Sequence, residues 1–424
     1  MAHKKHLIIG SGSAGLSAAE EIRRLNPNDE IKVVAAEDYS PYSPTVLPYF
    51  LAGRIDEARL PMRKDSYFNN LKTTLIRGKK VVQVLPQAKQ VVYQDGGRET
   101  YDTLLIASGA EATQPPIRGL VESGFLGFHT IADCKRLMQE LPGKKDVAVL
   151  GAGLVGMEVA IGLVEKGYRV TVIEKEPRVL PLYFDPEAES LIRAIFHKQG
   201  VNLLTGKQVS EVSRRNGRIE ISFTAGSPVS ADLLVTCIGV KSRTDFLNGS
   251  GVSVNRGIVV DRHMMTGVAD IYAAGDVAEA PDFFASEYGL NQIIESAVDE
   301  GTVAGANMAG DNKEYEGWIS SNIFNFFGYT AFSAGLSMPA DNNYEILSEK
   351  DDKGSQFKKL VFNGDRLVGA MFVNVELDPG VVLYLIRKKV DLTDYKTILF
   401  KQPREISRWL MLETEQRESA PIQG

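Results

Sequence analysis

Short apolar runs that end in glycine or other small residues recur along the chain, and they predict the parallel strands of an α/β fold. The first run covers residues 7–9 and the second covers 146–150, and each leads through small residues into a segment with helical periodicity. Two further runs, at 103–109 and 270–277, also end in small residues. Strands that alternate with helices in this way are typical of parallel sheets whose faces are covered by helices.

The first run leads into a G-x-G-x-x-G sequence at Gly10, Gly12 and Gly15. Glycine permits the tight turn at the first position, close backbone approach to a pyrophosphate at the second, and close helix–strand packing at the third. The next apolar run, 31–34, is followed by Glu37, whose carboxylate can accept hydrogen bonds from a ribose diol. This combination predicts a dinucleotide site, whereas a glycine turn alone would indicate only a tight loop.

The same pattern returns at Gly151, Gly153 and Gly156, and the strand expected at 169–173 ends at Glu174. The last glycine and the acid are 18 residues apart in this copy (156 to 174) and 22 apart in the first (15 to 37). Two copies of so constrained a pattern predict a second dinucleotide site.

Glu174 also favours one nucleotide over the other, because a carboxylate at this position accepts hydrogen bonds from a free 2′-hydroxyl and repels a 2′-phosphate. The site is therefore predicted to take NAD rather than NADP. Lys175 and Arg178 follow closely and could weaken this preference, but solvated surface cations are the more ordinary interpretation.

Shorter alternating segments predict antiparallel strands. The expected strands and turns are 81–84, 90–93 with a turn at 95–97, 218–223, and a hairpin of 357–362 and 366–373 around 363–365; helices are expected at 131–141, 291–310 and 381–389. Pro115 and Pro116 suggest a boundary, and aromatic residues become frequent after residue 314. We expect three domains, formed by 1–115 with 245–313, by 116–244, and by 314–424.

Composition changes this picture little. The chain has 424 residues, 44% of them hydrophobic and 24% charged, with a net charge of −6, which argues against nucleic acid as a partner. Its apolar runs are shorter than the ~18 residues that span a membrane. The two cysteines, Cys134 and Cys237, are far apart, the five histidines are scattered, and no metal site is expected. A cytoplasmic protein with reduced thiols is the resulting expectation.

With these residues in view, positions 4–310 resemble the FAD-dependent pyridine nucleotide oxidoreductases, the glutathione-reductase-like superfamily. The resemblance rests on both glycine motifs, on residues 106–109 (Ile-Ala-Ser-Gly, with Ser108 where the family has Thr) and on 271–277. It implies two Rossmann-like domains, for FAD and NAD, and a C-terminal α+β interface-like domain. It also implies that the helix near Glu300 and Gly301 points its N-terminus at the flavin.

The resemblance implies specific cofactor contacts. For FAD they are Gly10, Gly12, Ser13, Ala14, Gly15, Glu37, Ala107, Ser108, Gly109, Gly275, Asp276 and Val277. For NAD they are Gly151, Gly153, Leu154, Val155, Gly156, Glu158, Glu174, Ile238 and Gly239.

The departures from the family concern the flavin face. Thr45 stands where CoA-disulfide reductases and NADH oxidases have a cysteine, and Pro44 and Tyr49 stand where ferredoxin reductases tend to have Arg and Lys. Glu158 matches a family glutamate near the nicotinamide, but its usual basic partner is not evident. No catalytic residue is therefore certain, and the flavin-facing candidates are Thr45, Tyr49 and Glu158. An ordinary packed loop at 40–53 and a helix-surface acid at Glu158 are the alternatives.

These observations predict an oxidoreductase that exchanges hydride with NAD(H) and single electrons with an iron–sulfur protein or subunit. The stretch 43–49 is similar to that in NAD-linked FAD subunits of multi-subunit 2-oxoacid oxidoreductases of the phenylglyoxylate type. An NADH oxidase or CoA-disulfide (thiol) reductase, and a non-catalytic FAD- and NAD-binding scaffold, are the alternatives. The aromatic stretch 318–332 forms either a docking surface or part of the core. The cations at 387–389 either dock an acidic partner or interact favourably with the dipole of the helix that they end. The C-terminal domain could also mediate oligomerisation.

Overall fold

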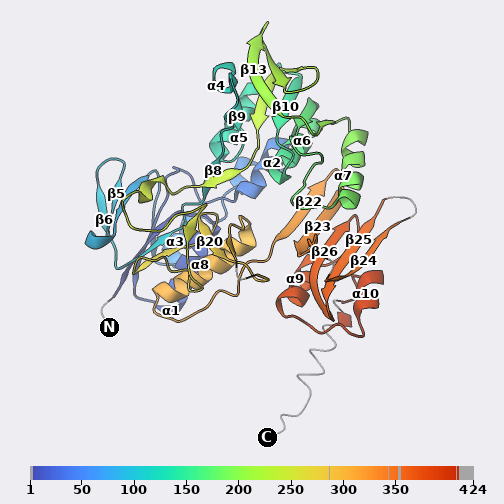
Figure 1. Cartoon of the computed structure of the whole chain (residues 1–424). Helices are drawn as coiled ribbons and strands as arrows, with labels where there is room; N and C mark the ends of the chain where they lie inside the picture. Colours follow the sequence, from blue (N-terminus) through green and yellow to red (C-terminus); the bar gives the residue numbers. More distant parts are fainter. Residues whose placement is uncertain (1–2, 286, 342, 352–354, 407, 410–424) are drawn as a thin grey trace. The chain divides into compact units, whose positions relative to one another are not determined.

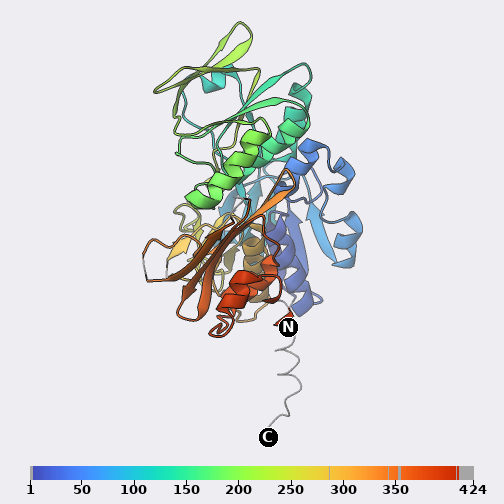
Figure 2. The ribbon, with the colours of Figure 1, turned by 90° about the vertical axis from the view of Figure 1, so that its right-hand side faces the viewer.

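The computed structural model describes residues 3–285, 287–341, 343–351, 355–406 and 408–409, and the chain forms two compact units (Figures 1 and 2). The first unit contains residues up to 115 together with 126–142 and 238–319, and the second contains 116–125, 143–237 and the residues from 320 on. None of the helices within the described ranges has both the length and the apolar character needed to cross a bilayer.

A parallel sheet forms the centre of the first unit. Its strand order is β19-β7-β1-β2-β3, with bounds β1 Lys5–Ile9, β2 Glu30–Val34, β3 Thr73–Ile76, β7 Thr103–Ile106 and β19 Ile271–Ala273. Ile9 lies opposite both Val34 and Ile106, so the three neighbouring strands end at one edge. Apolar side chains on both faces of these strands are buried, which explains why the sequence shows continuous rather than alternating apolar runs.

Helices α1 (Ser13–Leu25) and α8 (Ile294–Met308) pack closely against each other in the first unit. Small residues allow this approach, because a Cβ at Gly301 would lie 2.2 Å from the Ala14 carbonyl oxygen and one at Gly305 would lie 2.6 Å from that of Ala18. The helix that starts at the first glycine turn is therefore held by a segment almost 300 residues further along the chain.

The remaining elements of the first unit are short. They are η1 Pro44–Val46, α2 Leu47–Ala52, η2 Glu57–Arg59, α3 Asp65–Asn70, β4 Val81–Leu85, η3 Pro86–Ala88, β5 Gln90–Tyr93, β6 Arg98–Thr100, β8 Ala110–Ala112, β9 Leu126–Gly127, α5 Ile131–Glu140, β17 Val240–Ser242, η4 Asp245–Leu247, β18 Ile258–Val259, β20 Ala278–Pro281 and β21 Tyr288–Gly289. Strands β4, β5 and β6 are antiparallel, as their alternating sequence predicts.

The second unit repeats the strand–turn–helix arrangement. Its parallel strands follow the order β12-β11-β10-β16, with bounds β10 Asp146–Leu150, β11 Arg169–Ile173, β12 Asn202–Leu204 and β16 Leu233–Thr236. Its helices here are α4 Leu120–Ser123, α6 Leu154–Glu165 and α7 Pro186–Lys198, and its antiparallel strands are β13 Val209–Arg215, β14 Arg218–Phe223 and β15 Val229–Ala231. The α/β class and the repeated parallel-sheet architecture are confirmed.

The described part of the chain after residue 320 contains an antiparallel sheet of order β22-β23-β26-β25-β24, which confirms the α+β character predicted for the C-terminal part. Its elements are β22 Ser321–Phe326, β23 Tyr329–Gly335, β24 Glu345–Lys350, β25 Phe357–Asn363, β26 Arg366–Val373, α9 Pro379–Arg387 and α10 Lys396–Lys401. Helix α9 starts two residues before the expected position, because Asp378 caps it by accepting the N–H of Gly380 at 2.9 Å. The end of the expected polar tail, 410–424, lies outside the described residues.

The aromatic stretch that was a candidate docking surface is mostly core. Phe324, Phe326 and Phe332 are each at most 1% exposed, and the first two stack on Phe196 of α7. Trp318 packs against the core of the first unit and donates its indole N–H to the Ala280 carbonyl oxygen at 3.0 Å. The docking interpretation of these rings is therefore wrong: the phenylalanines alternate along the strands and point inward.

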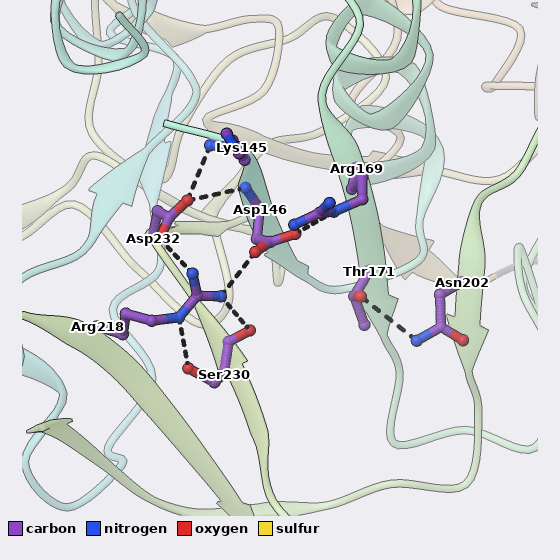
Figure 3. A network of polar contacts seen from close by, with 8 residues as sticks. All are labelled: Lys145, Asp146, Arg169, Thr171, Asn202, Arg218, Ser230 and Asp232. Carbon is purple, nitrogen blue, oxygen red and sulfur yellow. Dashed lines mark hydrogen bonds and ion pairs between the residues drawn. The ribbon is translucent and has the colours of Figure 1, made fainter. Parts of the chain in front are cut away.

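A network of charged side chains joins strands of the second unit (Figure 3). Arg218 pairs with Asp146 and with Asp232, each at 2.7 Å, and the backbone N–H groups of Lys145 and Asp146 donate to Asp232. Hydrogen bonds from Arg169 and then Arg218 lower the pKa of Asp146 to about 2. Asp146 is the first residue of β10, at the opposite end of that strand from the glycine turn, so the network holds strands together rather than forming part of a nucleotide site.

Candidate functional site

The first glycine turn has the geometry of a phosphate cradle. Gly10 has φ 111°, and a Cβ there would lie 2.0 Å from the Ala107 carbonyl oxygen, while a Cβ on Gly15 would lie 2.1 Å from that of Gly10. Gly12 precedes the first turn of α1, and the space where its Cβ would project is open to at least 4 Å. The first N–H groups of α1, from Ser13 on, have no partner within the helix, and the open position at Gly12 lets a diphosphate approach them.

The second turn repeats this geometry at the start of α6. Gly151 has φ 105°, and a Cβ on Gly156 would lie 2.0 Å from the Gly151 carbonyl oxygen. Nothing lies within 4 Å of the position that a Cβ on Gly153 would occupy. Leu154 and Val155 form the first turn of the helix, and Val155 is 44% exposed. This turn can also receive a diphosphate, from an open side.

Glu174 follows β11 directly and is buried beside the second glycine turn. One carboxylate oxygen accepts the Ala152 N–H at 2.7 Å and the other accepts the Glu176 N–H at 2.9 Å. Each oxygen has further lone pairs, so these two bonds fix the carboxylate and leave it able to accept from ribose hydroxyls. Lys175 is 75% exposed and pairs with Glu176 at 3.8 Å, as expected of a solvated cation.

Glu37 is placed differently, although the sequence pattern treats the two acids as equivalent. The N–H of Gly10 donates to Val34 just as that of Gly151 donates to Ile173, so the position that corresponds to Glu174 is Ala35. Glu37 lies two residues further on, where its carboxylate accepts the Tyr42 hydroxyl at 2.9 Å. The Tyr42 hydroxyl in turn accepts the N–H of Ile131, the first residue of α5.

The ends of β7 and β19 complete this part of the first unit. Ser108 donates its hydroxyl to the Arg243 carbonyl oxygen at 2.9 Å, and the Arg243 N–H donates to Gly109 at 3.0 Å, so residues 107–109 are held without their side chains blocking the turn. Gly275, Asp276 and Val277 follow the neighbouring strand, β19, after Ala273 and Ala274. Burial raises the pKa of Asp276, and the nearby His129 opposes this effect.

Glu300 is a buried carboxyl that the sequence pattern did not single out as a contact. It is 2% exposed, and its oxygen accepts the Gly275 N–H at 2.7 Å. Burial raises its pKa well above the usual range, and the charges of Asp276 and Asp299 add to this effect. Helix α8 begins at Ile294, three residues after the predicted start, and Glu300 and Gly301 lie within it.

Thr45 and Tyr49 lie on η1 and α2, in the segment that the resemblance places near the flavin. Thr45 is exposed, and its hydroxyl lies 2.8 Å from that of Ser43. Cys134, although remote in sequence, is close in space, because its thiol contacts the Leu47 carbonyl oxygen at 3.7 Å. Cys134 is fully buried, so the thiol does not stand in for the cysteine that Thr45 replaces.

The remaining predicted contacts have distinct environments. Glu158 lies on α6, and burial raises its pKa to about 7. Ile238 is 38% exposed and Gly239 has φ 107°. Cys237 directly follows β16, and burial raises the pKa of its thiol to about 12. A thiol with so high a pKa carries almost no thiolate at neutral pH and is a poor nucleophile.

Comparisons with known proteins agree with this geometry. The sequence profile of the pyridine nucleotide-disulphide oxidoreductases matches residues 4–301, and that of the rubredoxin NAD+ reductase C-terminal domain matches 320–375. The chain is 35% identical over 416 residues to the NADH-dependent phenylglyoxylate dehydrogenase subunit epsilon of Aromatoleum evansii, covering 97% of this chain and 98% of that protein.

A second relative supports the same assignment, and a solved structure supports the fold. The chain is 30% identical over 306 residues to the rubredoxin-NAD(+) reductase of Pseudomonas putida, covering 72% of this chain and 80% of that protein. The fold matches that of putidaredoxin reductase in its covalent complex with putidaredoxin, with a TM-score of 0.86 at 22% identity over 96% of this chain and 99% of that chain. The chain belongs to the pyridine nucleotide-disulphide oxidoreductase family, and its two glycine turns fit the FAD and NAD(H) that the family binds.

Proposed function

We propose that the protein transfers electrons between NAD(H) and a one-electron iron–sulfur protein or subunit, and that it is the NAD-linked flavoprotein subunit of a 2-oxoacid oxidoreductase complex. FAD supplies the conversion between hydride transfer and single-electron transfer. The similarity to a phenylglyoxylate dehydrogenase subunit supports the complex, and the similarity to a rubredoxin reductase supports an iron–sulfur acceptor. A cytoplasmic location is part of the proposal.

The environment of the thiols carries the proposal. Disulfide and oxidase chemistry in this family uses a cysteine at the flavin, and position 45 has a hydroxyl instead. Cys134 is fully buried, and burial raises the pKa of Cys237 to about 12, so neither thiol is suited to replace it. Electrons then leave the flavin without a protein thiol as an intermediate carrier.

The residue assignments and domain boundaries are part of this proposal. We assign the FAD diphosphate to the turn at Gly10–Gly15, and assign the NAD diphosphate and ribose to the turn at Gly151–Gly156 and to Glu174. The open space at Gly12 and Gly153 supports both assignments. We retain the three-domain division, with an FAD domain formed by 1–115 and 245–313.

The test compares electron acceptors with NADH as the donor. We expect rapid reduction of a one-electron acceptor such as ferricyanide or an iron–sulfur protein, slow oxygen uptake, and no reduction of CoA-disulfide. Rapid turnover with oxygen or CoA-disulfide, without one-electron transfer, would instead indicate an oxidase or disulfide reductase. A flavin that NADH does not bleach would indicate a non-catalytic scaffold.

A further inference from the structure

One exposed stretch of the first unit carries a charge opposite to that of the whole chain. Residues 54–80 contain eight Lys or Arg and three Asp or Glu, a local excess of five positive charges, whereas the chain has a net charge of −6. The stretch runs from the end of α2 through η2 and α3 to the residues after β3. It is thus a localised basic region on an acidic protein, and such asymmetry creates a local attractive potential for anions.

Three acids in or near this stretch pair with cations, and Asp56 is the remaining acid within it, so the cations still outnumber the acids. Glu20 pairs with Arg63 at 3.3 Å, and Asp65 pairs with Arg77 at 3.7 Å. Glu57 accepts from Lys135, a cation outside the stretch, at 2.7 Å.

Arg59 and Lys64 lie between these pairs and are both exposed. Within the described part of the chain, neither has a carboxylate within ion-pair distance. We call Arg54, Arg59, Arg63, Lys64 and Arg77 the basic surface.

The basic surface is continuous with the segment that the proposed function places at the flavin. The Arg54 guanidinium lies 5.7 Å from the centre of the Tyr49 ring, and the Arg54 N–H donates to the Tyr49 carbonyl oxygen at 2.9 Å. The loop that carries Arg63 is also tied to the segment before Thr45, because the Met62 N–H donates to the Pro41 carbonyl oxygen at 2.7 Å. A partner bound here would approach the protein at residues 41–49.

Iron–sulfur centres are held by cysteine thiolates, and each thiolate brings a negative charge to the centre. We propose that the basic surface docks an acidic iron–sulfur protein and directs its cluster toward the segment 45–49. The inference rests on the proposed transfer of electrons to such a protein. Docking of this kind acts mainly on the rate of association and weakens as salt is added.

The experiment compares two charge-reversed variants of the full-length protein. Arg59→Glu with Lys64→Glu changes the basic surface, and Lys388→Glu with Lys389→Glu makes the same change in charge at the end of α9. The probes are purified rubredoxin and a [4Fe–4S] ferredoxin, reduced with NADH at 20 mM and 500 mM salt. FAD content and anaerobic bleaching of the flavin by NADH are measured for every variant.

We expect the variant of the basic surface to lower kcat/KM for the carrier at least tenfold at low salt and by less than threefold at high salt. The α9 variant should stay within twofold of wild type, and flavin bleaching should be unchanged in both. Equal losses in both variants, or a loss only in the α9 variant, would overturn the assignment of the surface. If NADH bleaches the flavin of the wild-type protein but neither carrier is reduced, the proposed function itself is wrong. If the wild-type protein and the Arg59/Lys64 variant reduce the carriers equally well, only the assignment of the docking surface is wrong.

Discussion

Replacing Glu300 tests whether the buried carboxyl holds the Gly275–Asp276 turn in the geometry that FAD requires. In Glu300→Ala the Gly275 N–H loses its partner, at a site where the carboxyl was only 2% exposed and water has little access. An unpaired buried donor costs about 1–3 kcal/mol, which corresponds to roughly 5- to 150-fold weaker FAD binding if the turn bears the loss. Glu300→Gln keeps an oxygen acceptor and should bind FAD about as tightly as wild type at pH 6.

The pH dependence of FAD binding distinguishes the effect of the Glu300 charge from the effect of losing its hydrogen bond to Gly275. Burial raises the pKa of Glu300, so the folded protein holds a proton that the unfolded chain releases above about pH 4.3. The folded state is therefore favoured at low pH and becomes less stable as pH rises toward the folded-state pKa. We expect FAD binding to weaken over the same range, by at most about tenfold per pH unit for one proton, because ionised Glu300 adds a negative charge near Asp276 and the FAD diphosphate. In Glu300→Gln the part of this dependence that comes from Glu300 should disappear, which leaves only the smaller part from Asp276, whose pKa is also raised by burial.

The assay is titration of apoprotein with FAD, followed by quenching of flavin fluorescence, between pH 6 and 9. Glu316→Gln serves as the control, because Glu316 is exposed and lies next to Tyr315, another buried residue near Glu300. The reasoning is refuted if Glu300→Ala binds FAD as tightly as wild type, or if Glu300→Gln retains the wild-type pH dependence.

Three other expectations follow from the structure. Glu174→Ala should lower kcat/KM for NADH about tenfold or more, and it should lower the ratio of kcat/KM for NADH to kcat/KM for NADPH. Steady-state kinetics with both nucleotides measure this ratio, and an unchanged ratio would assign the preference for NADH to another residue. Arg218→Met should destabilise the protein by about 1–2 kcal/mol at pH 7 in denaturant titrations, since it removes two partly exposed ion pairs, and Arg169→Met should cost less. Because the pKa of Asp146 is lowered to about 2, the stability that its ion pair contributes is present above pH 4 and is lost as pH falls toward 2. The free energies of unfolding of wild type and Arg218→Met should therefore approach each other at low pH. A Cys134→Ser and Cys237→Ser double variant that retains FAD should also retain NADH–acceptor turnover, and loss of turnover with unchanged FAD content would implicate a thiol.

The sequence predicted the parallel strands well because each apolar run is bounded by residues that cannot extend it. Strands 146–150, 169–173 and 218–223 occur at the predicted residues, and Gly167 adopts φ 86° just after α6. These features are local, since a buried strand needs apolar side chains on both faces and a turn needs glycine where φ is positive.

The features that sequence reasoning missed depend on distant segments. The spacings of 22 and 18 residues do not reveal the offset between Glu37 and Glu174, because they also include the lengths of the helix and loop before each strand. The offset is seen only when the strand ends are matched, since Ile9 pairs with Val34 as Leu150 pairs with Ile173. In the sequence Glu300 is indistinguishable from an ordinary acid on a helix, because its hydrogen bond with Gly275 forms only in the folded protein. The alternating phenylalanines of β22 could have been assigned to the core from their period of two, which is the signal that should have outweighed their aromatic character.

The two glycine turns share a sequence pattern but have different surroundings, and the difference matches the lifetimes that the proposed reaction demands. The first turn is packed against α8 through Gly301 and lies beside the strand end whose Gly275 is fixed by Glu300. At the second turn Val155 is 44% exposed, whereas Ala14, the corresponding residue of the first turn, is 5% exposed. A flavin must remain bound through many turnovers, whereas a nicotinamide nucleotide must leave after each one. The extra contacts of the first turn therefore favour a resident FAD, and the exposed second turn favours exchange of NAD(H).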